Sequence, residues 1–368
     1  MESGKKPVIR GQAPGATDFA NYFSLYGHLF HQKEMLEDSV RMEAYQSAIL
    51  GNEINFSGKT VLDVGTGSGV LAVFAAQAGA KHVYAVEATD AAKFAQSVVT
   101  SCNLGHKITV IQGLVETISL PEKVDIIVSE WMGCFLLRES MLDSLLDARD
   151  RFLKPDGALY PSHASMYIAP AKCVEKSRQL AEYHNAMSEW YTFTEDAKSA
   201  YKMNFECLAK TFEMEVNNHL LRTAHNLDLD PEDLLGPPCC IKEIDLLRAT
   251  RKDVESVSSD FNMQISHESS EGAEMSAFVG WFDVKFNGSP HNPSLVEAEF
   301  STAPHEDWST HWGQQGFLVH PSFTVCDGDN VFGHIEMTRK PANPRLYDVS
   351  VTYRHGIGPE QRCTYNLD

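Results

Sequence analysis

Apolar and polar residues alternate along the chain with two different periods, and the change between them divides the sequence. From Lys59 to Gly157, short apolar runs are separated by stretches with helical spacing. Strands that alternate with helices are typical of a parallel sheet covered by helices on both faces. The expected strands are residues 59–64, 82–87, 107–112 and 123–129, and the expected helices lie near 68–78, 90–102 and 139–153.

After Pro161 the apolar residues recur at every second position in short runs, which predicts an antiparallel β-sandwich or β-barrel. Such runs are 277–286, 331–338 and 347–353, and a helical, partly polar stretch interrupts the strands near 172–238. The expected divisions are therefore a disordered tail (1–17), N-terminal helices (18–51), an α/β domain (52–159) and a β domain (160–368).

The first expected strand leads directly into a glycine-rich turn and a helix, the opening of a nucleotide-binding βαβ unit. Gly65, Gly67 and Gly69 allow the backbone to turn sharply and lie close to a ligand. The dinucleotide fingerprint would place its third glycine at position 70, which is Val70. Glu87, 22 residues after Gly65, ends the second strand and can accept the hydroxyls of a ribose. This pattern favours an S-adenosylmethionine enzyme over an NAD-dependent oxidoreductase; a simple tight turn is the structural alternative.

The formal net charge of −19 excludes nucleic-acid binding by phosphate neutralisation and would attract cationic partners. Acidity that only keeps the protein soluble is the alternative. No apolar run approaches the ~20 residues that cross a bilayer, so no membrane association is expected. The eight cysteines form no C-x-x-C pair, and neither a metal site nor a disulfide framework is expected.

Two glutamates, Glu130 and Glu139, bracket a largely apolar loop that follows the fourth expected strand. Buried carboxylates are unfavourable unless a cation pairs with them, and a planar guanidinium is their natural bidentate partner. Two such acids can hold one guanidinium from two sides. The alternatives are that Glu139 begins the next helix and that Glu130 is simply exposed.

Four motifs occur in a fixed order along the chain: Tyr22-Phe23-x-x-Tyr26, the glycine loop 61–69, the loop 129–139, and Thr310-His311-Trp312. Together they resemble the protein arginine methyltransferases, in particular the type I branch that forms asymmetric dimethylarginine. The resemblance implies a Rossmann-like S-adenosylmethionine-binding domain, N-terminal helices that cover the cofactor, and an antiparallel β-barrel domain with a helical dimerisation arm at about 172–238. This arm departs most from the family pattern.

The resemblance further implies a homodimer, S-adenosyl-L-homocysteine as the product, and basic arginine-containing proteins such as histone tails and RNA-binding proteins as substrates. It implies a nuclear and cytoplasmic location. A monomethylating or symmetrically dimethylating enzyme is the narrower alternative, and a cofactor-binding coactivator or adaptor is an alternative of another class.

Individual residues acquire expected roles from the resemblance. The guanidinium is held by Glu130 and Glu139, and His311 forms a proton-accepting pair with Asp38. Whether the proton leaves to Glu139 or to this pair stays open. Met35 crowds the reacting nitrogen and influences how many methyl groups are placed. The substrate-binding residues implied are Tyr26, Met35, Glu130, Met132, Glu139, His311 and Trp312.

On the cofactor side, the resemblance assigns the ribose hydroxyls to Glu87, the adenine edge to Glu116 with Val115, and the methionine carboxylate to Arg41. The full implied set of cofactor-binding residues is Tyr22, Tyr26, His31, Met35, Arg41, Asp63, Gly65, Thr66, Gly67, Gly69, Glu87, Ala88, Val115, Glu116 and Glu130.

Overall fold

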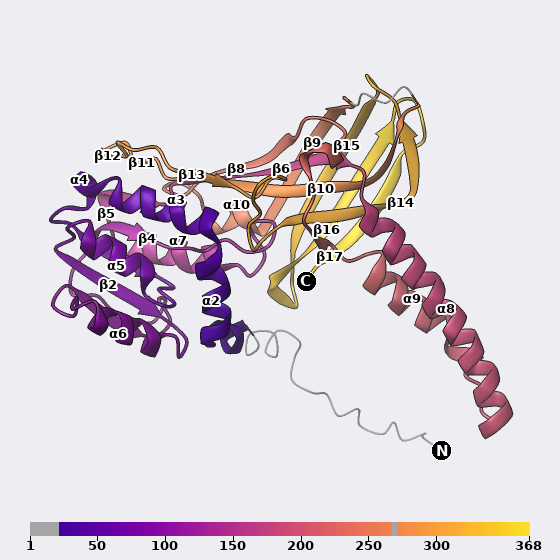
Figure 1. Cartoon of the computed structure of the whole chain (residues 1–368), viewed down its shortest axis with the longest axis horizontal. Coiled ribbons are helices and arrows are strands. Elements are labelled where there is room, and N and C mark those ends of the chain that lie inside the picture. Colours follow the sequence, from indigo (N-terminus) through magenta and orange to yellow (C-terminus); the bar gives the residue numbers. More distant parts are fainter. Residues whose placement is uncertain (1–21, 267–270) are drawn as a thin grey trace, which may run out of the picture.

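The computed structural model describes residues 22–266 and 271–368, so the tail expected at 1–17 lies outside the described residues. Figure 1 shows an α/β domain on the left, a β domain at the upper right, and a helical arm that projects from the β domain. In the described part of the chain, none of the helices has both the length and the apolar character that a membrane crossing requires.

The α/β domain is built on a five-stranded parallel sheet in the order β3-β2-β1-β4-β5. Its three central strands are almost fully buried because helices pack on each side, which confirms the predicted parallel sheet. The fifth strand was not expected, because Pro155, Asp156 and Gly157 interrupt its apolar pattern. The elements are β1 (Thr60–Val64), α5 (Val70–Gln77), β2 (His82–Glu87), α6 (Ala92–Ser101), β3 (Ile108–Gln112), β4 (Val124–Val128), α7 (Met141–Phe152) and β5 (Leu153–Tyr160).

The N-terminal helices lie against the end of this sheet. Residues 22–26 form a short helical turn, followed by α2 (Leu29–Glu37), α3 (Ser39–Leu50) and α4 (Glu53–Phe56). Asp38 separates α2 from α3 and caps α3 by accepting a hydrogen bond from the backbone N–H of Arg41 (3.0 Å). The buried Tyr45 of α3 donates its hydroxyl to the carbonyl of Ser129 (2.9 Å). That bond attaches α3 to the loop that follows β4.

The β domain consists of antiparallel strands around an aromatic core that includes Phe261, Phe278 and Tyr353. One sheet has the order β7-β14-β10-β6-β8, with β13 also on β10, and the other has the order β17-β16-β15-β9. The strands are β6 (His163–Ala171), β7 (His225–Leu227), β8 (Cys239–Asp245), β9 (Ser256–Gln264), β10 (Ala273–Lys285), β13 (Glu299–Ser301), β14 (Gln314–Val325), β15 (Asn330–Lys340), β16 (Asn343–His355) and β17 (Gln361–Leu367). The smaller elements are β11 (Gly288–Ser289), β12 (Asn292–Pro293) and α10 (Arg251–Glu255).

The arm is a pair of helices, α8 (Val174–Tyr201) and α9 (Ala209–Leu220), joined through η1 (Glu206–Leu208). Trp190 of α8 stacks on Phe212 of α9 with ring centroids 4.3 Å apart, which holds the two helices together. The chain then returns to the β domain through β7 and η2 (Pro231–Asp233). The helical part of the expected 172–238 arm is therefore shorter than that whole range.

Candidate active site

The glycine loop between β1 and α5 adopts a backbone that only glycine accommodates without strain. Gly65 and Gly67 have φ of +72° and +52°, in the left-handed region. A Cβ on Gly65 would lie 2.7 Å from Cε of Met141, and one on Gly67 would lie 2.6 Å from Oε1 of Gln32. Gly69 (φ +88°) instead faces Ala95 of α6, so this glycine serves helix packing. The first two glycines line a pocket.

Asp63 lies in β1, next to this loop, and holds the loop in place through a hydrogen bond. Its Oδ2 accepts a hydrogen bond from the Thr66 hydroxyl at 2.5 Å. Burial raises the pKa of Asp63 to about 7. The side chain is fully buried and lies outside the pocket wall, whereas Thr66 lines it.

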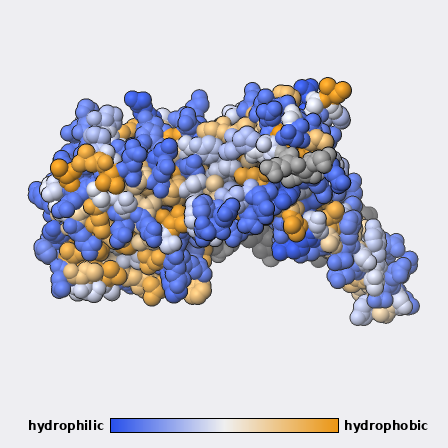
Figure 2. Space-filling model, turned by 45° about the horizontal axis from the view of Figure 1, so that its top comes forward, coloured by the Kyte–Doolittle hydropathy of each residue, from blue (hydrophilic) through white to orange (hydrophobic). Residues whose placement is uncertain are grey.

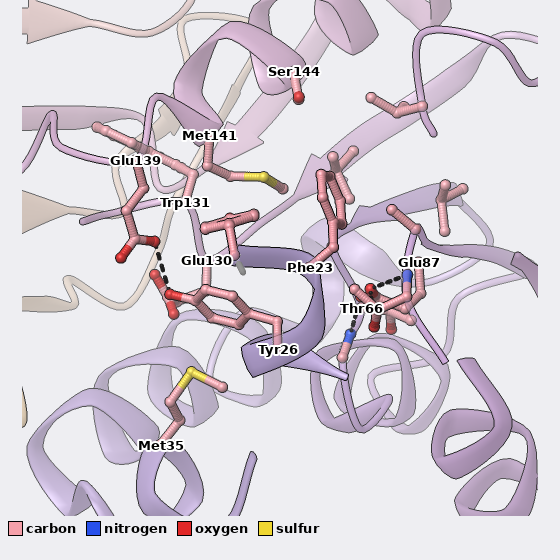
Figure 3. Close-up of a pocket in the computed structure, with 18 of the residues that line it drawn as sticks. Phe23, Tyr26, Met35, Thr66, Glu87, Glu130, Trp131, Glu139, Met141 and Ser144 are labelled. Carbon is pink, nitrogen blue, oxygen red and sulfur yellow. Dashed lines mark hydrogen bonds between the residues drawn. The ribbon is translucent and has the colours of Figure 1, made fainter. Parts of the chain in front are cut away.

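Glu87 ends β2 and is held with its carboxylate at the pocket. Oε2 accepts the backbone N–H of Gly67 (2.9 Å), and Oε1 accepts the N–H and hydroxyl of Thr89 (2.8 and 2.7 Å). Since these donors fix the carboxylate before any ligand arrives, Glu87 presents a preorganised acceptor for a sugar hydroxyl. Figure 3 shows Glu87 and Thr66 together on one side of the pocket.

Beyond Glu87, one end of the pocket combines an apolar residue with a polar one. Val115 is buried, and Glu116 accepts a hydrogen bond from the Ser144 hydroxyl (2.6 Å) at the exposed edge. Both residues line the pocket together with Ala88. This combination suits a flat heterocycle that needs an apolar face and a hydrogen-bond acceptor at its edge.

At the opposite end of the pocket lies the double-glutamate loop (residues 129–139). The backbone of this loop and of the residue after it is strained. Phe135, Leu136, Glu139 and Ser140 all have positive φ, at +46°, +67°, +79° and +58°. Such conformations are unfavourable for residues with a Cβ and gather at functional sites. The alternative that Glu139 begins a helix is wrong, because α7 starts only at Met141.

Glu130 accepts from two groups that fix its orientation. Nη1 of Arg41 donates to Oε2 (2.9 Å), and the backbone N–H of Met132 donates to Oε1 (3.0 Å). Arg41 is itself held by Met35, whose carbonyl accepts from Nε and Nη2 (3.2 and 2.6 Å). Only 14% of the Glu130 side chain is exposed, so the exposed alternative is wrong.

Glu139 faces the same pocket from the other end of the loop. The Tyr26 hydroxyl donates to its Oε2 (2.8 Å), and Arg138 donates to Oε1 (3.3 Å). Burial raises the pKa of Glu139, although the bond from Tyr26 and the charge of Arg138 oppose this. In Figure 3, Glu130 and Glu139 lie on the same side of the pocket with Tyr26 and Met35, opposite Glu87.

His311 and Asp38 form a close pair next to this end of the pocket. Nδ1 of His311 lies 2.7 Å from Oδ2 of Asp38, which also accepts the backbone N–H of His311 (3.0 Å). Burial by itself would raise the pKa of Asp38, but the hydrogen bonds from His311 and Arg41 outweigh it and lower the pKa. Trp312 donates Nε1 to the carbonyl of Met132 (3.1 Å), which fixes the β domain to the double-glutamate loop.

The structure brings most of the expected residues to one pocket of about 1100 Å³, open mouth included. Those on its wall are Tyr22, Tyr26, Met35, Arg41, Gly65, Thr66, Gly67, Glu87, Ala88, Val115, Glu116, Glu130, Met132 and Glu139. Those outside the wall are His31, Asp38, Asp63, Gly69, His311 and Trp312. His31 instead pairs with Glu34 (3.2 Å) and packs edge-on against the ring of Tyr26.

The pocket wall also contains residues that the sequence analysis missed, including Gln32, Thr89, Ser144 and Arg345. Phe23 is on the wall too, and its place in the Tyr22–Tyr26 motif is the signal that could have identified it. The others stand outside the recognised motifs, and Arg345 comes from the β domain.

The residues present fit S-adenosylmethionine. The glycine cradle would be filled by a Cβ, Glu87 is an oriented acceptor, Val115 is apolar, and Arg41 supplies a cation for a carboxylate. All of these groups line the same pocket.

Two family models match the chain. Residues 42–164 match the ribosomal protein L11 methyltransferase, and residues 162–358 match the arginine methyltransferase oligomerization subdomain. Protein arginine N-methyltransferase 10 of Arabidopsis thaliana is 47% identical over 353 residues, covering 95% of this chain and 91% of the relative. Protein arginine N-methyltransferase 1 of Schizosaccharomyces pombe is 38% identical over 340 residues, covering 92% and 91%.

Solved structures agree with these matches. The crystal structure of Arabidopsis thaliana protein arginine methyltransferase 10 is 44% identical with a TM-score of 0.91, covering 94% of this chain and 100% of that one. A Trypanosoma brucei arginine methyltransferase enzyme–prozyme complex with S-adenosylhomocysteine is 26% identical with a TM-score of 0.78, covering 93% and 99%. The predicted fold, a Rossmann-like domain followed by an antiparallel barrel-like domain, is confirmed. The chain belongs to the protein arginine N-methyltransferase family, and its methyl donor is S-adenosylmethionine.

Proposed function

We propose that this enzyme is of type I and places two methyl groups on one terminal nitrogen of arginine side chains in basic proteins. The observation that most supports an arginine side chain as the methyl acceptor is the placement of Glu130 and Glu139 on one wall of the cofactor pocket, each already accepting from an N–H or O–H donor. A substrate guanidinium presents donors of the same kind in a planar fork.

The two glutamates make a poor nucleophile react. A guanidinium is weakly nucleophilic because its charge is delocalised and its pKa exceeds about 12. When bound, S-adenosylmethionine supplies a methyl group bonded to a positively charged sulfur. Glu130 and Glu139 orient the guanidinium in line with that bond and draw positive charge away from the attacking nitrogen.

For the departing proton, we propose Glu139 as the acceptor. Its raised pKa brings it closer to the operating pH, which is what a general base requires. The His311–Asp38 pair lies outside the pocket wall, next to Arg41, and Trp312 beside it bonds to Met132. We therefore propose that the pair positions residues of the pocket and does not itself accept the proton. It holds the start of α3 against the β domain, since Asp38 accepts bonds from both.

The product type depends on the space beside the reacting nitrogen. Met35 is 7% exposed and lies on the pocket wall next to Arg41, where its thioether limits that space. Mass spectrometry that separates methylarginine isomers on an arginine-rich histone tail tests the assignment. Asymmetric dimethylarginine is expected. Symmetric dimethylarginine, or monomethylarginine alone, would refute the type I assignment. If several basic substrates give no methylated product, the alternative function of a cofactor-binding coactivator or adaptor is favoured.

The substrates proposed are basic proteins such as histone tails and RNA-binding proteins, because a net charge of −19 raises the local concentration of cationic chains. Their kcat/KM should fall as ionic strength rises. We also propose that the enzyme works in both nucleus and cytoplasm, where such substrates occur. A fluorescent fusion confined to one compartment would contradict that location.

We propose that the protein forms a homodimer through α8 and α9. The arm extends away from the rest of the molecule (Figure 2), and several of its large apolar side chains are exposed although a free surface would favour polar ones. On the α/β side, α2 exposes Leu29 and Phe30 close to the cofactor pocket. The exposed apolar residues of the arm and its connection are Val174, Tyr191, Phe193, Tyr201, Met203, Leu208 and Met214.

Sedimentation tests the dimer with the paired change of Tyr191 and Met214 to serine, which leaves the Trp190–Phe212 stack in place. We expect a monomer with weaker cofactor binding. A dimer of unchanged affinity would contradict the role of the arm.

A further inference from the structure

Arg345 belongs to the β domain and lines the pocket, although it lies far along the sequence from the other residues of the pocket wall. It is the third residue of β16, and its own backbone N–H is fixed by Oδ1 of Asn343 (3.2 Å). Its side chain nevertheless lines the pocket between the aromatic turn (residues 22–26) and the double-glutamate loop. No motif that identified the enzyme includes this position.

The first contact of Arg345 is to the backbone of Glu139. The Glu139 N–H donates to the Arg345 carbonyl (2.8 Å), and Nη1 of Arg345 donates to the Glu139 carbonyl (2.8 Å). Next to them, the Ser140 hydroxyl donates to the carbonyl of Pro344 (2.5 Å). Glu139 and Ser140 are two of the residues with left-handed φ, so β16 supplies the bonds that stabilise a strained backbone.

The second contact of Arg345 is to the aromatic turn. Its guanidinium carbon lies 3.8 Å from the ring centroid of Tyr22 and 5.4 Å from that of Phe23. Guanidinium groups stack on aromatic faces at such distances. Tyr22 packs against Tyr26 (4.7 Å), whose hydroxyl donates to the Glu139 carboxylate. The contacts therefore form a closed ring that runs from Arg345 through Glu139, Tyr26 and Tyr22 back to Arg345.

We propose that Arg345 is a positioning residue for methyl transfer, which joins the aromatic turn to Glu139 so that the β domain sets the geometry of the guanidinium site. The proposal rests on the proposed function of that site. Arg345 binds the backbone carbonyl of Glu139, while Tyr26 donates to the carboxylate of the same residue. Its charge also opposes the rise in the pKa of Glu139 that burial causes.

The experiment compares R345A, R345K and R354A in the full chain. Arg354 is a matched control, since it also lies on β16 with its guanidinium over an aromatic ring, Phe332 at 5.8 Å, but lies outside the pocket wall. We expect R345A to lower kcat on an arginine peptide about 10- to 100-fold, because small displacements of a reacting group have effects of that size. R354A should stay within twofold of the wild type.

The pH profile separates positioning from a general loss of structure. Without the Arg345 charge, the acid limb of kcat in R345A should move to higher pH. Lysine keeps the charge but lacks the planar fork, so R345K should restore the acid limb while regaining only part of kcat. Activity of R345A within twofold of the wild type, or an acid limb that does not move, would overturn the proposal.

Hydrogen exchange of residues 22–26 measures the contact without any reaction. We expect faster exchange in R345A than in the wild type or R354A, and equal exchange would overturn the proposal. If the wild type forms no methylarginine, the proposed function fails, whereas the exchange measurement still tests the ring of contacts. If R345A does not fold, the same comparisons are made with R345K and with Y22L, which removes the stacked ring.

Discussion

Asp38 contributes more to the stability of the protein than its position between two helices suggests, so its removal should lower the free energy of unfolding by a measurable amount. Its side chain is 2% exposed and accepts three hydrogen bonds, from the Arg41 N–H, the His311 N–H and His311 Nδ1. A lost helix cap costs about 1 kcal/mol, and a lost bond to a charged group costs about 1.5–3 kcal/mol. We therefore expect D38A to lower the free energy of unfolding by about 2.5–4 kcal/mol, from the lost cap and the lost bond to the His311 side chain together.

The D38N variant separates the charge from the cap. Asparagine still caps α3 but carries no charge, so the expected loss is about 1–2 kcal/mol. The lowered pKa of Asp38 means that its contribution is fully present above the unfolded pKa, near 3.8, and is lost as the pH falls through the folded pKa. The difference between wild type and D38N should therefore persist from pH 7 to pH 5 and narrow only below about pH 3.8.

Urea unfolding at a series of pH values measures this difference, with D253N as the matched control. Asp253 belongs to the exposed capping box at Thr250 and does not line the pocket, so the loss of stability in D253N should be smaller. A difference between wild type and D38N that narrows already between pH 7 and pH 5, or that is no larger than that of D253N, would refute the reasoning.

Three further predictions concern the pocket itself. E130Q should bind S-adenosylhomocysteine as the wild type does in calorimetry but lose at least about 100-fold in kcat, because the substrate charge loses its partner; unchanged methylation of arginine peptides would contradict the role of Glu130. Y26F removes a bond that lowers the pKa of Glu139, so the acid limb of the pH–rate profile should move to higher pH, and an unmoved limb would argue against Glu139 as the base. G65A places a Cβ at φ +72° and 2.7 Å from Met141 Cε, so cofactor affinity should fall about tenfold or more, measured by the same calorimetry; full affinity would show that the loop can relax.

Local sequence patterns predicted the parallel sheet and the cofactor side of the pocket well, for a physical reason. The glycine loop, Glu87 and the strand before each of them lie within one βαβ unit, where hydrophobic period and turn chemistry are fixed by near neighbours. The strand β5 was missed because Pro155 and Gly157 break its pattern, although pairing with β4 supplies the bonds that hold it.

What the sequence determined by itself is therefore the fold class and the chemical character of the pocket, through motifs whose spacing is local. What only the tertiary structure decided is which distant groups complete that pocket. Arg345 meets Glu139 across 206 positions by packing of the β domain against the double-glutamate loop. The pair of Asp38 and His311, 273 positions apart, was expected only through the family resemblance, and the packing of the β domain against α3 brings it together. Arg345 carries no periodic or local signal, because a contact of this kind is set by the docking of two domains on one shared core.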